Sequence, residues 1–185
     1  DIKSFITEVQ KPGRYTGGEP GSVYKNKDEV KMRVAFCFPD TYEIGMSNLG
    51  MRILTGVLNE MNDVWCERVF APWTDMEEKM RERGVPLFAH ESGDNVRDFD
   101  MVAFTLQYEL CYTTALNMLD LAGIPLRSSE RHDLKNIVFA GGVCTFNPEP
   151  LADFVDFFSL GEGEDITVEI VSLYDRAKAE SWSKE

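Results

Sequence analysis

The feature that most constrains this chain is the alternation of short apolar runs with stretches of helical periodicity. The runs occupy residues 31–38, 64–70, 101–106, 137–140 and 157–160. An unbroken apolar run is typical of a strand in a parallel sheet, because helices cover both faces of such a sheet. The alternation therefore predicts repeated strand–helix units.

Helical periodicity fills the gaps between the runs. Helices are expected over residues 45–61, 74–83, 110–121 and 165–179, with a short one near 151–154. Gly84 and Gly123 follow the second and third helices, where a glycine commonly ends a helix. Right-handed crossovers then predict an α/β fold, a flavodoxin-like (Rossmann-like) doubly wound parallel sheet of five main strands in the order 2-1-3-4-5. Leu49, Ile53 and Leu110 are expected in its core.

Length and composition favour one domain with an extension. The chain has 185 residues and 43% hydrophobic content, enough to bury a core. We expect an α/β domain over residues 30–180, preceded by an N-terminal extended arm or linker over residues 1–29. The arm is rich in glycine and proline between Pro12 and Gly21, which blocks regular structure. It is either an entry linker or a loop that lies across a site, with Arg14 and Tyr15 as possible ligand contacts.

Charge and hydropathy exclude several functions. A formal net charge of -13 repels polyphosphate and argues against direct binding of nucleic acid or anionic membranes. No apolar run approaches the ~20 residues that span a bilayer, and the first residues lack a signal-peptide pattern. A cytoplasmic protein without a membrane partner is expected. Its scattered cysteines are predicted to be small buried residues, and His90 and His132 to lie on the surface.

Known catalytic patterns do not occur in the sequence. There is no glycine-rich phosphate loop, no GxSxG elbow, and no close cysteine pair of the kind that builds zinc or iron–sulfur sites. Thr105 stands where a phosphorelay receiver would need its acceptor aspartate, and the first loop lacks the flavodoxin phosphate pattern. We therefore predict no catalytic residue and no metal ligand within this chain.

Loops at the carboxyl ends of the strands are the candidate ligand site. In the predicted strand order the first and third strands flank the point where the order reverses, and open α/β sheets bind ligands there. The loops are residues 40–47, 105–109, 141–147 and 161–164. Gly141 and Gly142 permit close approach of a ligand or of another backbone, and a tight turn explains them equally well. Glu162 could face a ligand or simply precede a helix.

Taken together, these loops resemble the N-terminal domain of cobalamin-binding-type radical S-adenosylmethionine (radical SAM) proteins, over roughly residues 30–165. The resemblance rests on MRVAFCFPDTYEIGMSNLG, FTLQYEL, GGVCTFNPEPLADFVD and LGEGE, with KPGRYTGGEPGSVYK as the lead-in. These phrases look most like an uncharacterised subgroup of that family. The combination is specific, although each phrase alone is weak.

The resemblance implies a cobalamin site whose lower-ligand position is altered. The family's DxHxxG motif corresponds here to Asp40, Tyr42 and Gly45, and a phenol with a pKa of about 10 is a poor cobalt ligand. Any bound cobalamin is therefore expected in the His-off form. Thr105 falls where a family serine lines the nucleotide tail, while Gln107 replaces a leucine. The implied cofactor-binding residues are Asp40, Thr41, Tyr42, Gly45, Ser47, Thr105, Gln107, Gly141, Gly142, Gly161 and Glu162.

The family's second half does not occur in this sequence. Its barrel holds a [4Fe–4S] cluster on CxxxCxxC and binds S-adenosylmethionine, and no such spacing occurs among the four cysteines. The resemblance implies a radical SAM barrel downstream in the same chain, with this domain covering its active site and either binding cobalamin or shaping the substrate pocket. A cofactor-free Rossmann-like scaffold or interaction domain is the alternative, and a free-standing enzyme that binds a small molecule is a third.

Overall fold

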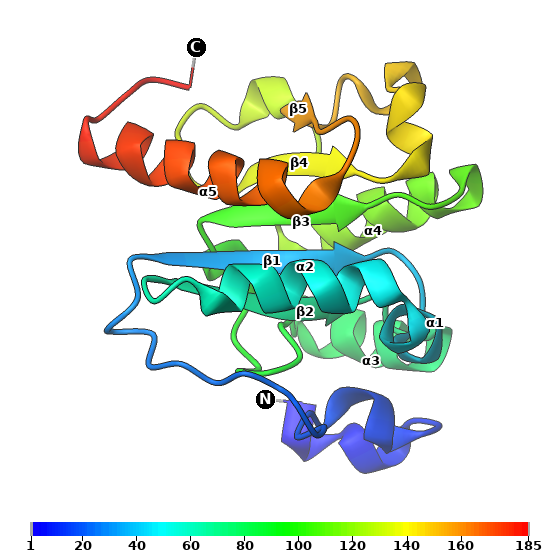
Figure 1. The fold of residues 1–185 in the computed structure, drawn as a ribbon. Coiled ribbons are helices and arrows are strands. Elements are labelled where there is room, and N and C mark those ends of the chain that lie inside the picture. The colour runs from blue at the N-terminus through cyan, green and yellow to red at the C-terminus, as the bar shows by residue number, and fades with distance from the viewer. Residues whose placement is uncertain (1, 185) are drawn as a thin grey trace.

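The computed structural model describes residues 2–184 and has a parallel sheet between two layers of helices (Figure 1). Val34 pairs with Cys66 on one side and with Met101 on the other, which places the first strand inside the sheet, between the second and the third. The order β2-β1-β3-β4-β5 is the predicted one, so the flavodoxin-like fold is confirmed. The strands of this sheet are β1 (Met32–Phe38), β2 (Val64–Phe70), β3 (Met101–Thr105), β4 (Ile137–Gly141) and β5 (Phe157–Phe158).

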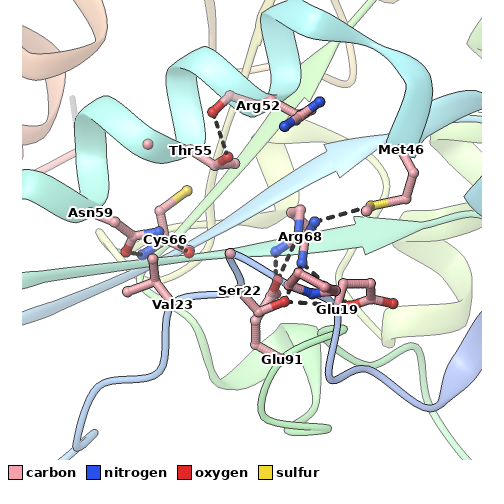
Figure 2. Close-up of a pocket in the computed structure, with 13 residues that line it drawn as sticks. Glu19, Ser22, Val23, Met46, Arg52, Thr55, Asn59, Cys66, Arg68 and Glu91 are labelled. Carbon is pink, nitrogen blue, oxygen red and sulfur yellow. Dashed lines mark hydrogen bonds and ion pairs between the residues drawn. The ribbon is translucent and has the colours of Figure 1, made fainter.

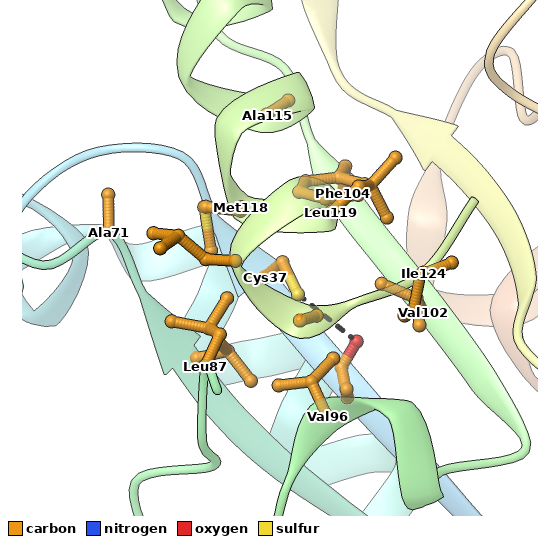
Figure 3. Packing of buried hydrophobic residues seen from close by; sticks show 14 of the residues in the cluster. Cys37, Ala71, Leu87, Val96, Val102, Phe104, Ala115, Met118, Leu119 and Ile124 are labelled. Atoms are coloured by element: carbon orange, nitrogen blue, oxygen red, sulfur yellow. Dashed lines mark hydrogen bonds between the residues drawn. The ribbon is translucent and has the colours of Figure 1, made fainter. Parts of the chain in front are cut away.

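Helices cover both faces of the sheet. On one face lie α2 (Leu49–Glu60) and α5 (Gly163–Ala179), and on the other lie α3 (Thr74–Arg83) and α4 (Tyr112–Ala122) (Figure 1). Each face has its own apolar cluster, and Figure 3 shows the one beneath α4, where Met118 and Leu119 pack near Cys37 of β1. None of the helices formed by residues 2–184 is both long and apolar enough to cross a bilayer.

Several predicted boundaries need correction. Gly84 and Gly123 end α3 and α4 in the left-handed conformation, as predicted. The helix predicted over residues 45–61 is instead two, α1 (Tyr42–Ser47) and α2, because Asn48 caps α2 by accepting a hydrogen bond from the Met51 amide at 2.8 Å. Single 3-10 turns lie at Ile2–Ser4, Ile6–Glu8, Pro12–Tyr15, Val96–Asp98, Glu109–Cys111, Ser128–Glu130, Val143–Phe146 and Glu149–Leu151, the last replacing the short helix predicted near 151–154.

Burial corrects part of the predicted core. Leu49, Ile53 and Leu110 are exposed, so their assignment to the core was wrong. Helical periodicity identifies an apolar residue but not whether anything covers it, and Leu110 lies in the 3-10 turn that precedes α4. The prediction of buried cysteines is confirmed for Cys37, Cys66 and Cys111, while Cys144 is half-buried. Burial raises the pKa of the Cys37 thiol.

The N-terminal arm packs against the domain. Phe5, Val9 and Tyr15 are buried and join the apolar cluster on the α3 and α4 face. Farther along, the Trp65 indole donates to the Val23 carbonyl at 3.1 Å, and the Lys25 ammonium donates to carbonyls of residues 61 and 64. The arm therefore runs beside β2, the strand at one border of the sheet (Figure 1).

Candidate functional site

The loops after β1 and β3 meet at the carboxyl edge of the sheet. Asp40 Oδ1 accepts a hydrogen bond from the Thr41 amide at 2.6 Å, and Asp40 Oδ2 accepts one from the Tyr108 hydroxyl. Burial and this hydrogen bond to the carboxylate raise the pKa of Tyr108 to about 12. The structure thus brings Asp40 to the third-strand loop, as the strand order requires, and uses its carboxylate to tie the two loops together.

Tyr42 points to the arm. Its hydroxyl donates to Glu19 Oε1 at 2.9 Å, and His90 Nε2 lies 2.7 Å from the same oxygen. The Tyr42 and His90 rings are 5.3 Å apart, and both contact Phe70 at the end of β2. His90 is only 7% exposed, so its prediction as a surface residue was wrong, because the arm covers it and Glu19 supplies its partner.

The polar side chains predicted to contact a ligand at Thr105, Gln107 and Ser47 form hydrogen bonds within the chain. The Gln107 amide donates to Thr105 Oγ1 at 2.7 Å, and Thr105 is buried. Ser47 likewise donates to the Ile44 carbonyl at 2.7 Å. These hydroxyls therefore already have partners in the protein itself.

Close packing accounts for two of the predicted glycines. A Cβ added to Gly142, which has φ of +104°, would lie 2.6 Å from the Leu106 carbonyl oxygen. A Cβ on Gly45 would lie 2.4 Å from the Phe70 ring. Only a glycine fits at these positions without a shift of its neighbours. The loop after β4 thus uses Gly142 to pack against the loop after β3.

The remaining predicted residues lie at the surface near β5. Gly161 has φ of +101° with open space around it, and Glu162 is exposed just before α5. Gly141 is half-buried, and a Cβ there would lie 3.9 Å from Ser159. None of residues 2–184 forms a group of three or more His, Cys, Asp or Glu side chains that could hold a metal ion.

In this arrangement the side chain of Tyr42 is not suited to serve as a ligand to cobalt. The Tyr42 hydroxyl is directed at Glu19, and burial together with that carboxylate raises its pKa, so the phenol keeps its proton. The nearest imidazole, His90, is engaged with the same carboxylate. The Leu106 backbone occupies the space next to Gly142 in which a Cβ would lie. Binding of cobalamin without a protein ligand stays a prediction.

A cavity of about 450 Å³ adjoins these loops between the arm, α2 and β2 (Figure 2). Its floor carries Arg68, which donates to Glu91 Oε1 at 2.6 Å and to Ser22 Oγ at 2.7 Å. Arg68 also lies 3.5 Å from Glu19, so it holds the arm and the β2 side together. Sequence reasoning missed this group, because its members are far apart along the chain and match no motif.

The carboxyl edge over β3, β4 and β5 is apolar and uncovered. Four side chains here are largely exposed: Leu110 (85%), Phe146 (75%), Val143 (68%) and Leu160 (58%). They follow the ends of three adjacent strands, so they share one edge of the sheet. Large apolar side chains that are exposed together at one edge of a sheet are candidates for an interaction site.

Two comparisons with known proteins give the family context. A family model described as radical SAM proteins, N-terminal, matches residues 50–185, which is well over half of the chain. The chain is also similar to an uncharacterized protein, MJ0966, of Methanocaldococcus jannaschii, with 26% identity over 148 residues. That match covers 77% of this chain and 28% of the relative, so the chain spans about a quarter of the relative's length.

Proposed function

The chain belongs to the family of radical SAM proteins, N-terminal, and we propose that it is an accessory domain whose carboxyl edge packs against the radical SAM domain of the same protein. In that position the loops after β3, β4 and β5 cover the active site of the radical SAM domain and shape its substrate pocket. The reaction itself belongs to the other domain, since this chain supplies no cluster ligands.

The observation that carries the proposal is the row of exposed apolar side chains at Leu110, Val143, Phe146 and Leu160. Exposed aromatic and aliphatic groups are typical of the apolar centre of an interface, where they leave water when the partner binds. The occupant we propose is the radical SAM domain, because the family is defined by its position before that domain and the similar protein extends far beyond the matched region.

The charges around this row support a partner with a basic rim. The segments 105–111, 141–150 and 159–166 contain no Lys, Arg or His. Their exposed acids include Glu109, Glu149 and Glu162, and no ion pair forms at these three within the part of the chain that the structure describes. Acidic residues around an apolar centre would steer and orient a basic surface, so the association should weaken as salt is raised.

Separate expression of the two parts tests the proposal. The radical SAM part of the protein that carries this chain is titrated with residues 1–185 in a calorimeter. Leu110→Asp and Phe146→Asp should each weaken the association at least about 30-fold, because each places a charge in the buried centre. Leu173→Asp on α5 is the matched control, since Leu173 is also an exposed leucine. Equal affinities for all three variants would contradict the proposal.

Cobalamin bound in the His-off form at the same edge is the second candidate. What favours it is that apolar and aromatic groups stand uncovered at the carboxyl ends of the strands, where open α/β sheets bind ligands. Titration of the purified chain with hydroxocobalamin, followed by the visible spectrum, tests this. No spectral change at high micromolar concentration would exclude it. Tyr42→His is the companion variant, and gained coordination would place position 42 beneath cobalt.

A further inference from the structure

Three parts of the chain form most of the cavity between the arm and α2, and Met46 and Glu91 complete its lining. Residues 19–23 of the arm form one wall, α2 forms the second with Arg52, Thr55, Gly56 and Asn59, and β2 forms the floor with Cys66 and Arg68 (Figure 2). A Cβ on Gly56 would meet no atom within 4 Å, so the helix wall is open at this point. The volume of about 450 Å³ is within the range of small-molecule sites.

Two arginines line this cavity, and only one of them has partners. Arg68 donates to Glu91 and Ser22 and lies near Glu19, and its side chain is 12% exposed. Arg52 is exposed, and its guanidinium forms no hydrogen bond or ion pair with any of residues 2–184. In Figure 2 no dashed line reaches the Arg52 guanidinium, whereas several reach Arg68.

The sequence around Arg52 leaves this charge available. The residues three and four positions away on α2, where an acidic partner would sit, are Asn48, Leu49, Thr55 and Gly56. The two carboxylates of the cavity, Glu19 and Glu91, are already paired with Arg68, and Glu19 also accepts from Tyr42 and His90. Of the two arginines that line the cavity, Arg52 is therefore the one whose guanidinium has no partner among residues 2–184.

We propose that this cavity binds a small oxyanion, a carboxylate or a phosphate, whose charge pairs with Arg52. The planar guanidinium presents paired N–H donors that match both groups, and Met46, Val23 and Pro20 offer apolar contacts for the remainder of a ligand. The site is independent of the docking edge, because it lies over β2 and not over the loops after β3, β4 and β5.

Titration of the whole chain with two probes tests this proposal and separates its two forms. Citrate represents carboxylates and inorganic phosphate represents phosphates, and binding is followed by calorimetry and by the amide NMR shifts of Gly21 and Gly56. At least one probe should bind with a Kd of about 1 mM or tighter. Tighter citrate assigns a carboxylate ligand, and tighter phosphate assigns a phosphate ligand.

Arg52→Gln should weaken the binding of that probe about 10- to 100-fold, as expected for loss of a charge-assisted pair. Arg97→Gln is the matched control, because Arg97 is likewise exposed and lies outside the cavity. Gly56→Leu places a side chain in the cavity without altering its charge and should abolish binding. The variant protein should still fold, because leucine favours a helix more than glycine does. The proposal is overturned if neither probe binds at 10 mM, or if Arg52→Gln and Arg97→Gln bind alike.

Discussion

The carboxyl edge of the sheet has two halves that differ in what covers them. Over β1 and β2 the arm lies on the loops, and its Glu19 satisfies Tyr42 and His90. Over β3, β4 and β5 nothing within residues 2–184 covers Leu110 or Phe146. The covered half is held by charged and polar contacts, and the bare half presents apolar groups with acids around them. The difference indicates that the arm covers one half of the edge within this chain, whereas the other half is available to a partner outside it.

Removal of the Arg68 side chain should give the largest loss of stability among the changes in the covered half. Arg68→Met leaves Glu91, whose side chain is 4% exposed, without its charged partner, although the backbone amide of residue 68 still donates to it. An uncompensated buried charge costs about 3–5 kcal/mol, so the free energy of unfolding in urea should fall by that amount. Arg97→Met is the control and should change it by less than about 0.5 kcal/mol. A loss of under 1 kcal/mol for Arg68→Met would show that the arm contacts contribute little.

In the bare half, alanine substitutions at Gly142 and Gly161 should separate the cost of a steric clash from the cost of a positive φ. Gly142→Ala and Gly161→Ala both place a side chain at positive φ, but only the Gly142 Cβ meets backbone, 2.6 Å from the Leu106 carbonyl. We expect Gly142→Ala to cost about 1–3 kcal/mol more than Gly161→Ala, measured by urea unfolding. Equal costs would mean that the loop after β4 moves freely, and that the space beside Gly142 can open to a ligand.

Acid should release the arm. Burial opposes ionisation of Glu19, yet the hydrogen bonds from His90 and Tyr42 outweigh it, so its pKa is lowered from 4.5. A carboxylate with a lowered pKa stabilises the fold above its unfolded pKa, and this stability is lost as the pH falls through the folded pKa. At pH 7 Glu19→Gln should cost about 1–2 kcal/mol. The difference from wild type should shrink below pH 4.5, and a difference that stays constant with pH would refute the role of the charge.

The smallest change in the free energy of unfolding is expected for Phe146→Asp. In the isolated chain Phe146→Asp removes a side chain that is 75% exposed, so the free energy of unfolding should change by less than about 0.5 kcal/mol. Thermal and urea unfolding of the variant check this. A large loss would mean that Phe146 stabilises this domain itself, and the bare half would then no longer differ from the covered one.

The fold could be predicted because its signals are local. Short apolar runs predicted the strands, and glycines predicted the ends of α3 and α4. The break at Asn48 was also readable, since asparagine is a common helix cap, although the apolar periodicity on both sides concealed it. Exposure of Leu49 and Leu110 could not be read, because the apolar pattern does not say whether a partner covers a residue.

The candidate site was predicted only in part, for a related reason. The strand order places Asp40 and Tyr108 together, so their contact follows from topology. The contact of Glu19 with His90 joins residues that are 71 positions apart through an arm without regular structure, and no local pattern encodes it. Loop motifs therefore indicated the right edge of the sheet but not which half of it the chain itself covers.

Footprinting in the longer protein tests whether the radical SAM domain covers the bare half of the carboxyl edge. Hydroxyl radicals modify exposed side chains, and mass spectrometry compares Phe146 and Leu110 in the isolated chain with the same residues when the radical SAM domain is present. We expect strong protection of both residues in the longer protein, with Trp73 and Tyr24, which are exposed on the covered side, unchanged. Equal modification of Phe146 and Leu110 in the two forms would contradict it.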